Sequence, residues 1–156
     1  MTYLYRADQK GALKPADPTY DFVLDNCSWS QAFQKAKAAG GHLVRIETKA
    51  EYDTIREQIN QRGLEYVMFR VGARRDENGT DFYWVDDSNK PVGQPLNNAL
   101  DQIGAQWGAG EPSLKWNGTE ETAVEFEFST GVWVWNDIAD QPNLAPNDNY
   151  GYIIEY

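Results

Sequence analysis

Residues 86–121 place the strongest constraint on the fold, because this long stretch lacks the periodicity of a helix or a strand. It is rich in Gly, Pro, Asn and Asp, which favour turns. A loop of this length inside a compact domain is usually either functional or disordered. Trp107 and Trp116 lie within it, and such large aromatic side chains indicate order. The sequence therefore predicts regular elements around a long, ordered loop.

A first helix is predicted before this loop. Residues 28–31, Ser-Trp-Ser-Gln, form a capping box, in which the Ser and Gln side chains satisfy otherwise unpaired backbone amides. Trp29, Phe33 and Ala36 then share one helical face, which we expect to be buried. Gly40-Gly41 ends this helix of about eleven residues.

A second helix follows the same pattern. Residues 48–51, Thr-Lys-Ala-Glu, form another capping box. Tyr52, Ile55 and Ile59 come next on one face, and Gly63 ends the helix.

Short strands are predicted for the rest of the chain. Turn residues separate neighbouring strands at 76–79 and 129–131, whereas the two prolines of segment 14–18 are expected to exclude regular structure. We therefore predict the α+β class, with two early helices and small antiparallel sheets around the long loop. The predicted strands are residues 20–24, 67–71, 82–85, 123–128, 132–135 and 150–156.

Composition limits the kinds of partner. The 156 residues, 41% of them hydrophobic, suit one folded domain. Twenty-four acidic against 14 basic residues leave a net charge of −10, which disfavours nucleic acid and anionic membranes and favours multivalent cations. No apolar run approaches the roughly 18 residues of a membrane helix, and the first residues lack the pattern of a secretory signal. We expect neither nucleic-acid binding nor membrane insertion.

The scarcity of Cys and His argues against an enzyme. Cys27 is the single cysteine, so it has no partner for an internal disulfide or a paired thiol site. His42 is the single histidine, and no neighbouring Ser or Cys is marked out as a nucleophile. We expect both side chains to have structural roles.

Two acidic motifs could bind a metal ion. The first is Gly-Glu-Pro-Ser at 110–113, followed by Glu120 and Glu121, and the second is Trp-Asn-Asp at 135–137, where a strand ends. Carboxylate and amide oxygens are the ligands that calcium prefers. Taken alone, each motif is more typical of solvated loop charges than of a metal site.

Motifs along residues 21–156 resemble, in order, those of the C-type lectin-like domain. We therefore expect a single domain over residues 1–156, with residues 1–20 as an N-terminal extension. The matching segments are the first helix and its Gly-Gly-x-Leu exit (28–32, 40–44), the second helix (Glu51, Ile55), the strands at 71–73, 82–86 and 152–155, the Trp-x-x-Gly-Glu-Pro loop (107–113) and Trp-Asn-Asp (135–137).

The resemblance implies a calcium site and a cis peptide bond before Pro112. Glu120 is the alternative to Glu121 as the third of the calcium ligands, because the length of the loop leaves the alignment with the family open. Ser113 stands where the family has Asn, and its shorter hydroxyl puts direct coordination in doubt. The implied calcium ligands are Glu111, Ser113, Glu121, Asn136 and Asp137.

The resemblance also implies a function, which is calcium-dependent carbohydrate binding. The same five residues would exchange hydrogen bonds with two vicinal sugar hydroxyls, and Glu111 before the proline resembles the form selective for mannose, fucose and glucose. Trp116 could stack on a sugar or pack within the loop. A calcium-independent protein- or peptide-binding module is the main alternative. A glycosidase using Glu111 and Asp137 is the third, with little support.

The disulfide positions of the family are lost. This departure resembles cysteine-free bacterial members, which are often modules of large secreted adhesins. We therefore expect an extracellular or cell-surface domain that binds glycans on cell surfaces. The residues that stand at the family's disulfide positions are Ala36, Ala123, Asp140 and Ile154.

Overall fold

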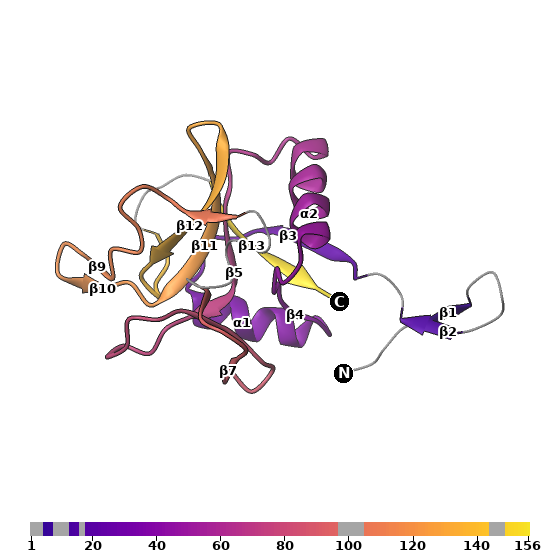
Figure 1. The fold of residues 1–156 in the computed structure, drawn as a ribbon, viewed down its shortest axis with the longest axis horizontal. Coiled ribbons are helices and arrows are strands. Elements are labelled where there is room, and N and C mark those ends of the chain that lie inside the picture. Colours follow the sequence, from indigo (N-terminus) through magenta and orange to yellow (C-terminus); the bar gives the residue numbers. More distant parts are fainter. Residues whose placement is uncertain (1–4, 8–12, 16–17, 97–104, 144–148) are drawn as a thin grey trace.

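The computed structural model describes residues 5–7, 13–15, 18–96, 105–143 and 149–156. Two helices lie beside a central β-sheet (Figure 1): α1 (Trp29–Ala38) runs across the lower part of the view, and α2 (Lys49–Gln61) stands upright. In this described part of the chain, neither helix is long and apolar enough to span a membrane.

Both helices begin at the predicted capping boxes. The Ser28 hydroxyl accepts a hydrogen bond from the Gln31 amide at 3.1 Å, and the Gln31 side chain accepts one from the Ser28 amide at 3.0 Å. Thr48 and Glu51 form the same reciprocal pair at the start of α2. The predicted faces are buried, with Trp29, Phe33 and Ala36 in α1 and Tyr52, Ile55 and Ile59 in α2.

The described strands include a nine-stranded sheet, whose main path runs β3-β13-β5-β11-β12-β8. β4 pairs with β13, β6 with β5, and β7 with β6. Most pairings are antiparallel, but β13 with β5 and β12 with β8 are parallel. The α+β class is confirmed, although the strands join in one mixed sheet that is larger than predicted. Its strands are β3 (Tyr20–Leu24), β4 (His42–Leu43), β5 (Met68–Arg74), β6 (Tyr83–Val85), β7 (Pro91–Val92), β8 (Gln106–Trp107), β11 (Ala123–Ser129), β12 (Val132–Ile138) and β13 (Tyr150–Glu155).

Two further strands precede this sheet. β1 (Tyr5–Ala7) and β2 (Leu13–Pro15) form a two-stranded antiparallel sheet at the right of Figure 1. The prediction that residues 14–18 exclude regular structure is therefore wrong for Lys14 and Pro15. Proline is tolerated in an edge strand, which has no second neighbour requiring its missing N–H group.

The long loop is ordered over its described residues, 86–96 and 105–121. It contributes β7 and β8 to the sheet, and β9 (Lys115–Trp116) pairs with β10 (Thr119–Glu120) in a separate hairpin at the left of Figure 1. Each of these strands has two residues, which is too short to leave a detectable sequence period. Residues 97–104 lie outside the described part.

Aromatic side chains from several strands form the centre of the main core. Trp135 is completely buried, and its ring lies 4.9 Å from that of Phe126 and 5.7 Å from that of Trp84. Tyr52 connects α2 to the same cluster through an edge contact with Phe126. This packing fixes β12 at Trp135, the first residue of the Trp-Asn-Asp motif.

Apolar contacts occupy three of the four positions where the resemblance implies disulfides. Ala36, Ala123 and Ile154 belong to one buried cluster, which also includes Cys27 as a free, buried thiol. Asp140 instead accepts hydrogen bonds from the backbone amide and hydroxyl of Ser30. The fold therefore relies on packing and hydrogen bonds in these places.

Glu155 in β13 provides a pH-dependent contribution to stability. Its side chain is 13% exposed, and burial raises its pKa from 4.5 to about 7. A raised pKa in the folded state means that this contribution is complete below about pH 4.5 and is lost as the pH rises through 7.

Glu155→Gln should remove this pH dependence. Over the range from pH 4.5 to 7, the free energy of unfolding of the wild type should fall relative to the variant by up to about 1.4 kcal/mol per pH unit. Urea titrations at several pH values measure this difference. Parallel pH profiles for the two proteins would contradict the prediction.

Candidate functional site

Three carboxylates from separate segments meet at one end of the sheet. Glu111 lies in the loop, Glu121 just precedes β11, and Asp137 lies in β12. One carboxylate oxygen from each residue lies within 4.8 Å of those from the other two. The structure thus brings together Glu111 and Glu121 from the first motif singled out in the sequence and Asp137 from the second. We call these three residues the carboxylate cluster.

Asp137 is the anchor of this cluster. It is 1% exposed, and the pairing of β12 with β11 holds it opposite Val124. Its two carboxylate oxygens accept hydrogen bonds from the backbone amides of Ser113 at 3.0 Å and Leu114 at 2.7 Å. The side chain therefore ties the loop to the sheet.

Ser113 lies within the cluster despite its short side chain. Its hydroxyl donates to Glu121 Oε2 at 2.6 Å, and its backbone amide donates to Glu111 Oε2 at 2.8 Å. The peptide bond between Glu111 and Pro112 is cis, as the resemblance implies. Ser113 thus connects the two glutamates that flank it in space.

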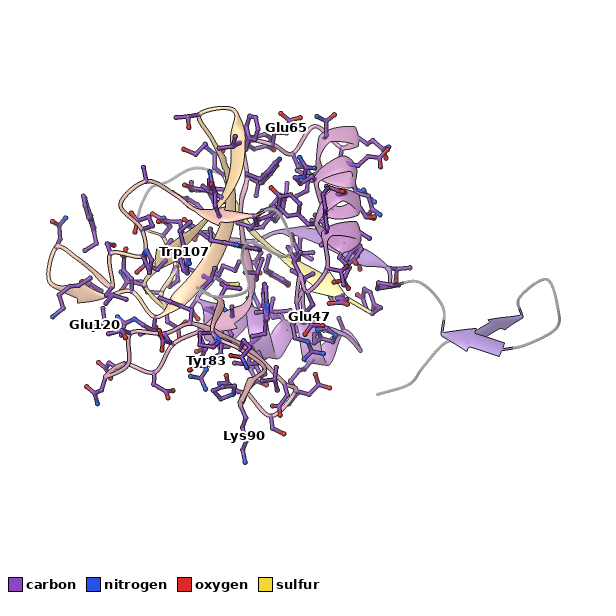
Figure 2. The ribbon with its side chains drawn as sticks, in the orientation of Figure 1. Glu47, Glu65, Tyr83, Lys90, Trp107 and Glu120 are labelled. Carbon is purple, nitrogen blue, oxygen red and sulfur yellow. The ribbon has the colours of Figure 1, made fainter. Side chains whose placement is uncertain are left out.

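The two candidate acids at 120 and 121 have different partners. Glu120 lies in β10 of the hairpin, at the left of Figure 2. Its carboxylate pairs with Arg75 at 2.6 Å and with Lys115 of β9 at 3.0 Å. Hydrogen bonds from these two side chains lower the pKa of Glu120. Glu121 is the acid whose carboxylate joins the cluster, so its role as a ligand in preference to Glu120 stays a prediction.

Asn136 lies beside the cluster and is held by an acid that the sequence analysis missed. Its Nδ2 donates to Glu125 Oε1 at 2.9 Å, and Glu125 is 2% exposed. Burial raises the pKa of Glu125 to about 7. The predicted three-residue turn at 129–131 would have placed Glu125 opposite Trp135. The observed ladder already pairs Ser129 with Val132, and this shift by one position brings Glu125 opposite Asn136.

A cavity of about 530 Å³ opens beside these residues. Glu111, Ser113 and Glu121 line one part of it, and residues 139, 141, 142 and 143 line another. Trp116 in β9 also lines the cavity and is 67% exposed. An apolar ring face therefore stands near the carboxylates and is free to contact a ligand.

The electrostatics of the cluster suit a hard cation. Burial and, next, the neighbouring Asp137 carboxylate raise the pKa of Glu111. Burial also raises the pKa of Glu121. Both shifts reflect the cost of crowding negative charge away from water, which a bound cation would offset. Carboxylate oxygens are ligands that calcium prefers, and the Ser113 and Asn136 side chains line the same cavity as Glu111 and Glu121.

Sequence comparison finds C-type lectin relatives. Human C-type lectin domain family 4 member D is 29% identical over 117 residues, which are 74% of this chain and 46% of the relative. Mouse C-type lectin domain family 6 member A is 29% identical over 111 residues, or 70% of this chain and 44% of the relative. The chain thus spans about half the length of these curated relatives. No family model matches it.

Solved structures with the same architecture are also C-type lectin domains. The C-type lectin domain of murine dendritic cell inhibitory receptor 2, in complex with an N-glycan, has a TM-score of 0.60 at 23% identity and covers 89% of this chain and 90% of its own. The carbohydrate-recognition domain of cow CD23, in the presence of an oligosaccharide, has a TM-score of 0.63 at 20% identity. The match covers 98% of this chain and 97% of the CD23 chain. The chain has the C-type lectin-like fold, and its sequence relatives support a C-type lectin-like domain.

Asp137→Ala should destabilise the domain even without metal. The backbone amides of Ser113 and Leu114 would lose their acceptor in a buried place, which costs about 1–3 kcal/mol of unfolding free energy. Glu121→Ala should cost less, because its partner is the exposed Ser113 hydroxyl. Urea denaturation in excess chelator compares the two. Equal losses would contradict the anchoring role of Asp137.

Proposed function

We propose that this chain is a calcium-dependent carbohydrate-binding module and not an enzyme. The single observation that carries the proposal is the carboxylate cluster of Glu111, Glu121 and Asp137, whose oxygens lie within 4.8 Å of one another. Acids held this close repel one another, so the arrangement is most stable around a cation. The glycan in the complex of the murine receptor supports a carbohydrate as the ligand.

Five residues would hold the ion, namely Glu111, Ser113, Glu121, Asn136 and Asp137. Bound calcium supplies coordination positions for two neighbouring hydroxyls of a sugar. The glutamate oxygens accept hydrogen bonds from such hydroxyls, whereas the Asn136 amide nitrogen can donate. Glu111 before the proline favours sugars of the mannose, fucose or glucose type.

Trp116 would extend the sugar-binding surface. Its exposed ring lines the same cavity as Glu111 and Ser113, so that one face of a sugar could pack against it while the hydroxyls meet the cluster. The cavity of about 530 Å³ is large enough for more than one ring.

The setting that we propose is extracellular or at the cell surface. Residues 1–156 would form one domain, with 21–156 as the lectin-like part and 1–20 as an extension, acting as a module of a larger secreted adhesin of bacterial type. Apolar packing at Ala36 and Ile154 in place of a disulfide is consistent with such members. The relatives named above are mammalian, so the bacterial origin rests on the sequence motifs alone.

Calcium should stabilise the domain. At about one hundred times Kd, ligation adds about 2.7 kcal/mol, which corresponds to a rise in Tm of about 5–10 °C for a domain of this size. Thermal unfolding in millimolar calcium is compared with unfolding in excess chelator. Glu111→Gln and Glu121→Gln should abolish the rise, and Glu57→Gln on the exposed face of α2 should retain it. No rise in the wild type would refute the calcium site and favour calcium-independent binding of a protein or peptide.

Retention on immobilised sugars tests which class of sugar the protein binds. In calcium, the protein should be retained on mannose, fucose or glucose resin more strongly than on galactose resin, and chelator should release it. Trp116→Ala should weaken retention about two- to tenfold, which is the range expected for one aromatic contact. Tyr66→Ala, at another exposed aromatic residue, is the matched control. Retention that persists in chelator would contradict the proposed mechanism.

A further inference from the structure

Arg75 is a buried cation surrounded by oxygen atoms. It directly follows β5, and its side chain is 1% exposed. Five backbone carbonyls and one carboxylate accept hydrogen bonds from its guanidinium group at 2.6–3.2 Å. The acceptors are the carbonyl oxygens of Asp76, Glu77, Gly79, Leu114 and Glu121, together with Glu120 Oε2.

This set of acceptors is of the kind that proteins usually offer to a hard metal ion. Carbonyl and carboxylate oxygens from several loops surround calcium in the same way. A guanidinium group can take that place, because it carries a permanent charge and five N–H donors in a fixed plane. The neighbouring residues 76–79, 114 and 120–121 are thereby tied to a single side chain.

We propose that Arg75 acts as an internal cation that holds the loop around Leu114 and Glu121 in its ligand-binding conformation before calcium arrives. This inference rests on the proposed function, because it makes Arg75 a positioning residue for the calcium site. Arg75 has no direct role in coordination.

Two residues, Leu114 and Glu121, link Arg75 to the carboxylate cluster. The carbonyl of Leu114 accepts from Arg75 at 2.6 Å, while the amide of Leu114 donates to Asp137 at 2.7 Å. Leu114 has a φ angle of 68°, which a leucine adopts only where its surroundings impose it. Fixed on both sides, Leu114 keeps the loop against the sheet.

The second contact passes through Glu121. Its carbonyl accepts from Arg75 Nε at 3.0 Å, and its amide donates to the Leu114 carbonyl at 3.0 Å. Its side chain belongs to the carboxylate cluster. Since the three carboxylates repel one another, the backbone at Glu121 needs a fixed attachment, and Arg75 supplies it.

Hydrogen exchange in excess chelator tests this role directly. In Arg75→Lys, which keeps the charge but has only three donors, the amides of residues 114–121 should exchange at least about tenfold faster than in the wild type. Amides of β5 and β12 should be unchanged. Arg74→Lys is the matched control and should behave as the wild type. Within the described part of the chain, the hydrogen bonds of the Arg74 side chain go to Asn89 and Asp76, which both lie outside residues 114–121.

Calcium affinity provides the second measurement. Calorimetry should give a Kd for calcium that is at least about tenfold weaker in Arg75→Lys than in Arg74→Lys. Should Arg75→Lys fail to fold, Glu120→Gln, which removes one charged acceptor, should still accelerate exchange at residues 114–121 by a smaller factor.

The outcomes separate this inference from the proposed function. Unchanged exchange at 114–121, or a uniform loss of protection over the whole sheet, would overturn the positioning role of Arg75. Faster local exchange in a protein whose wild type binds no calcium would support the loop attachment and refute the calcium site.

Discussion

The carboxylate of Asp137 fixes the long loop to the β-sheet, and the geometry of the candidate site depends on this contact. Its two oxygens accept the amides of Ser113 and Leu114 in a place that water barely reaches. Hydrogen bonds from backbone amides to a buried carboxylate are strong and directional. Because β12 pairs with β11 over seven residues, the loop acquires at this point the rigidity of the sheet.

The same anchoring creates an electrostatic cost. Glu111 and Glu121 are brought close to Asp137, and their pKa values rise through burial and mutual repulsion. The fold supports this arrangement with a positive charge of its own, since Arg75 binds the backbone on both sides of the β9–β10 hairpin. A domain organised in this way holds its acids together in advance, and the free energy of cation binding then need not reorganise the loop.

Local chemistry explains which elements the sequence predicted well. Both helices start at a capping box, in which two side chains three residues apart each accept a hydrogen bond from the backbone amide of the other residue. This interaction depends only on a few neighbouring residues. The strands predicted at 20–24 and 123–128 were similarly visible as segments rich in apolar and aromatic residues between turns. The two-residue strands and the β1–β2 pair were missed, because such short ladders are stabilised by partners distant in sequence or by a single turn.

The sequence by itself determined the two helices, the α+β class, the acidic motifs and, through its resemblance to a known family, the choice of Glu111, Glu121 and Asp137. Only the tertiary structure decided how these acids are supported. Glu125 holds Asn136, and Arg75 collects carbonyl oxygens from three separate segments. Backbone carbonyls are the same in every residue, so no residue type in the sequence marks which of them will converge on a buried charge.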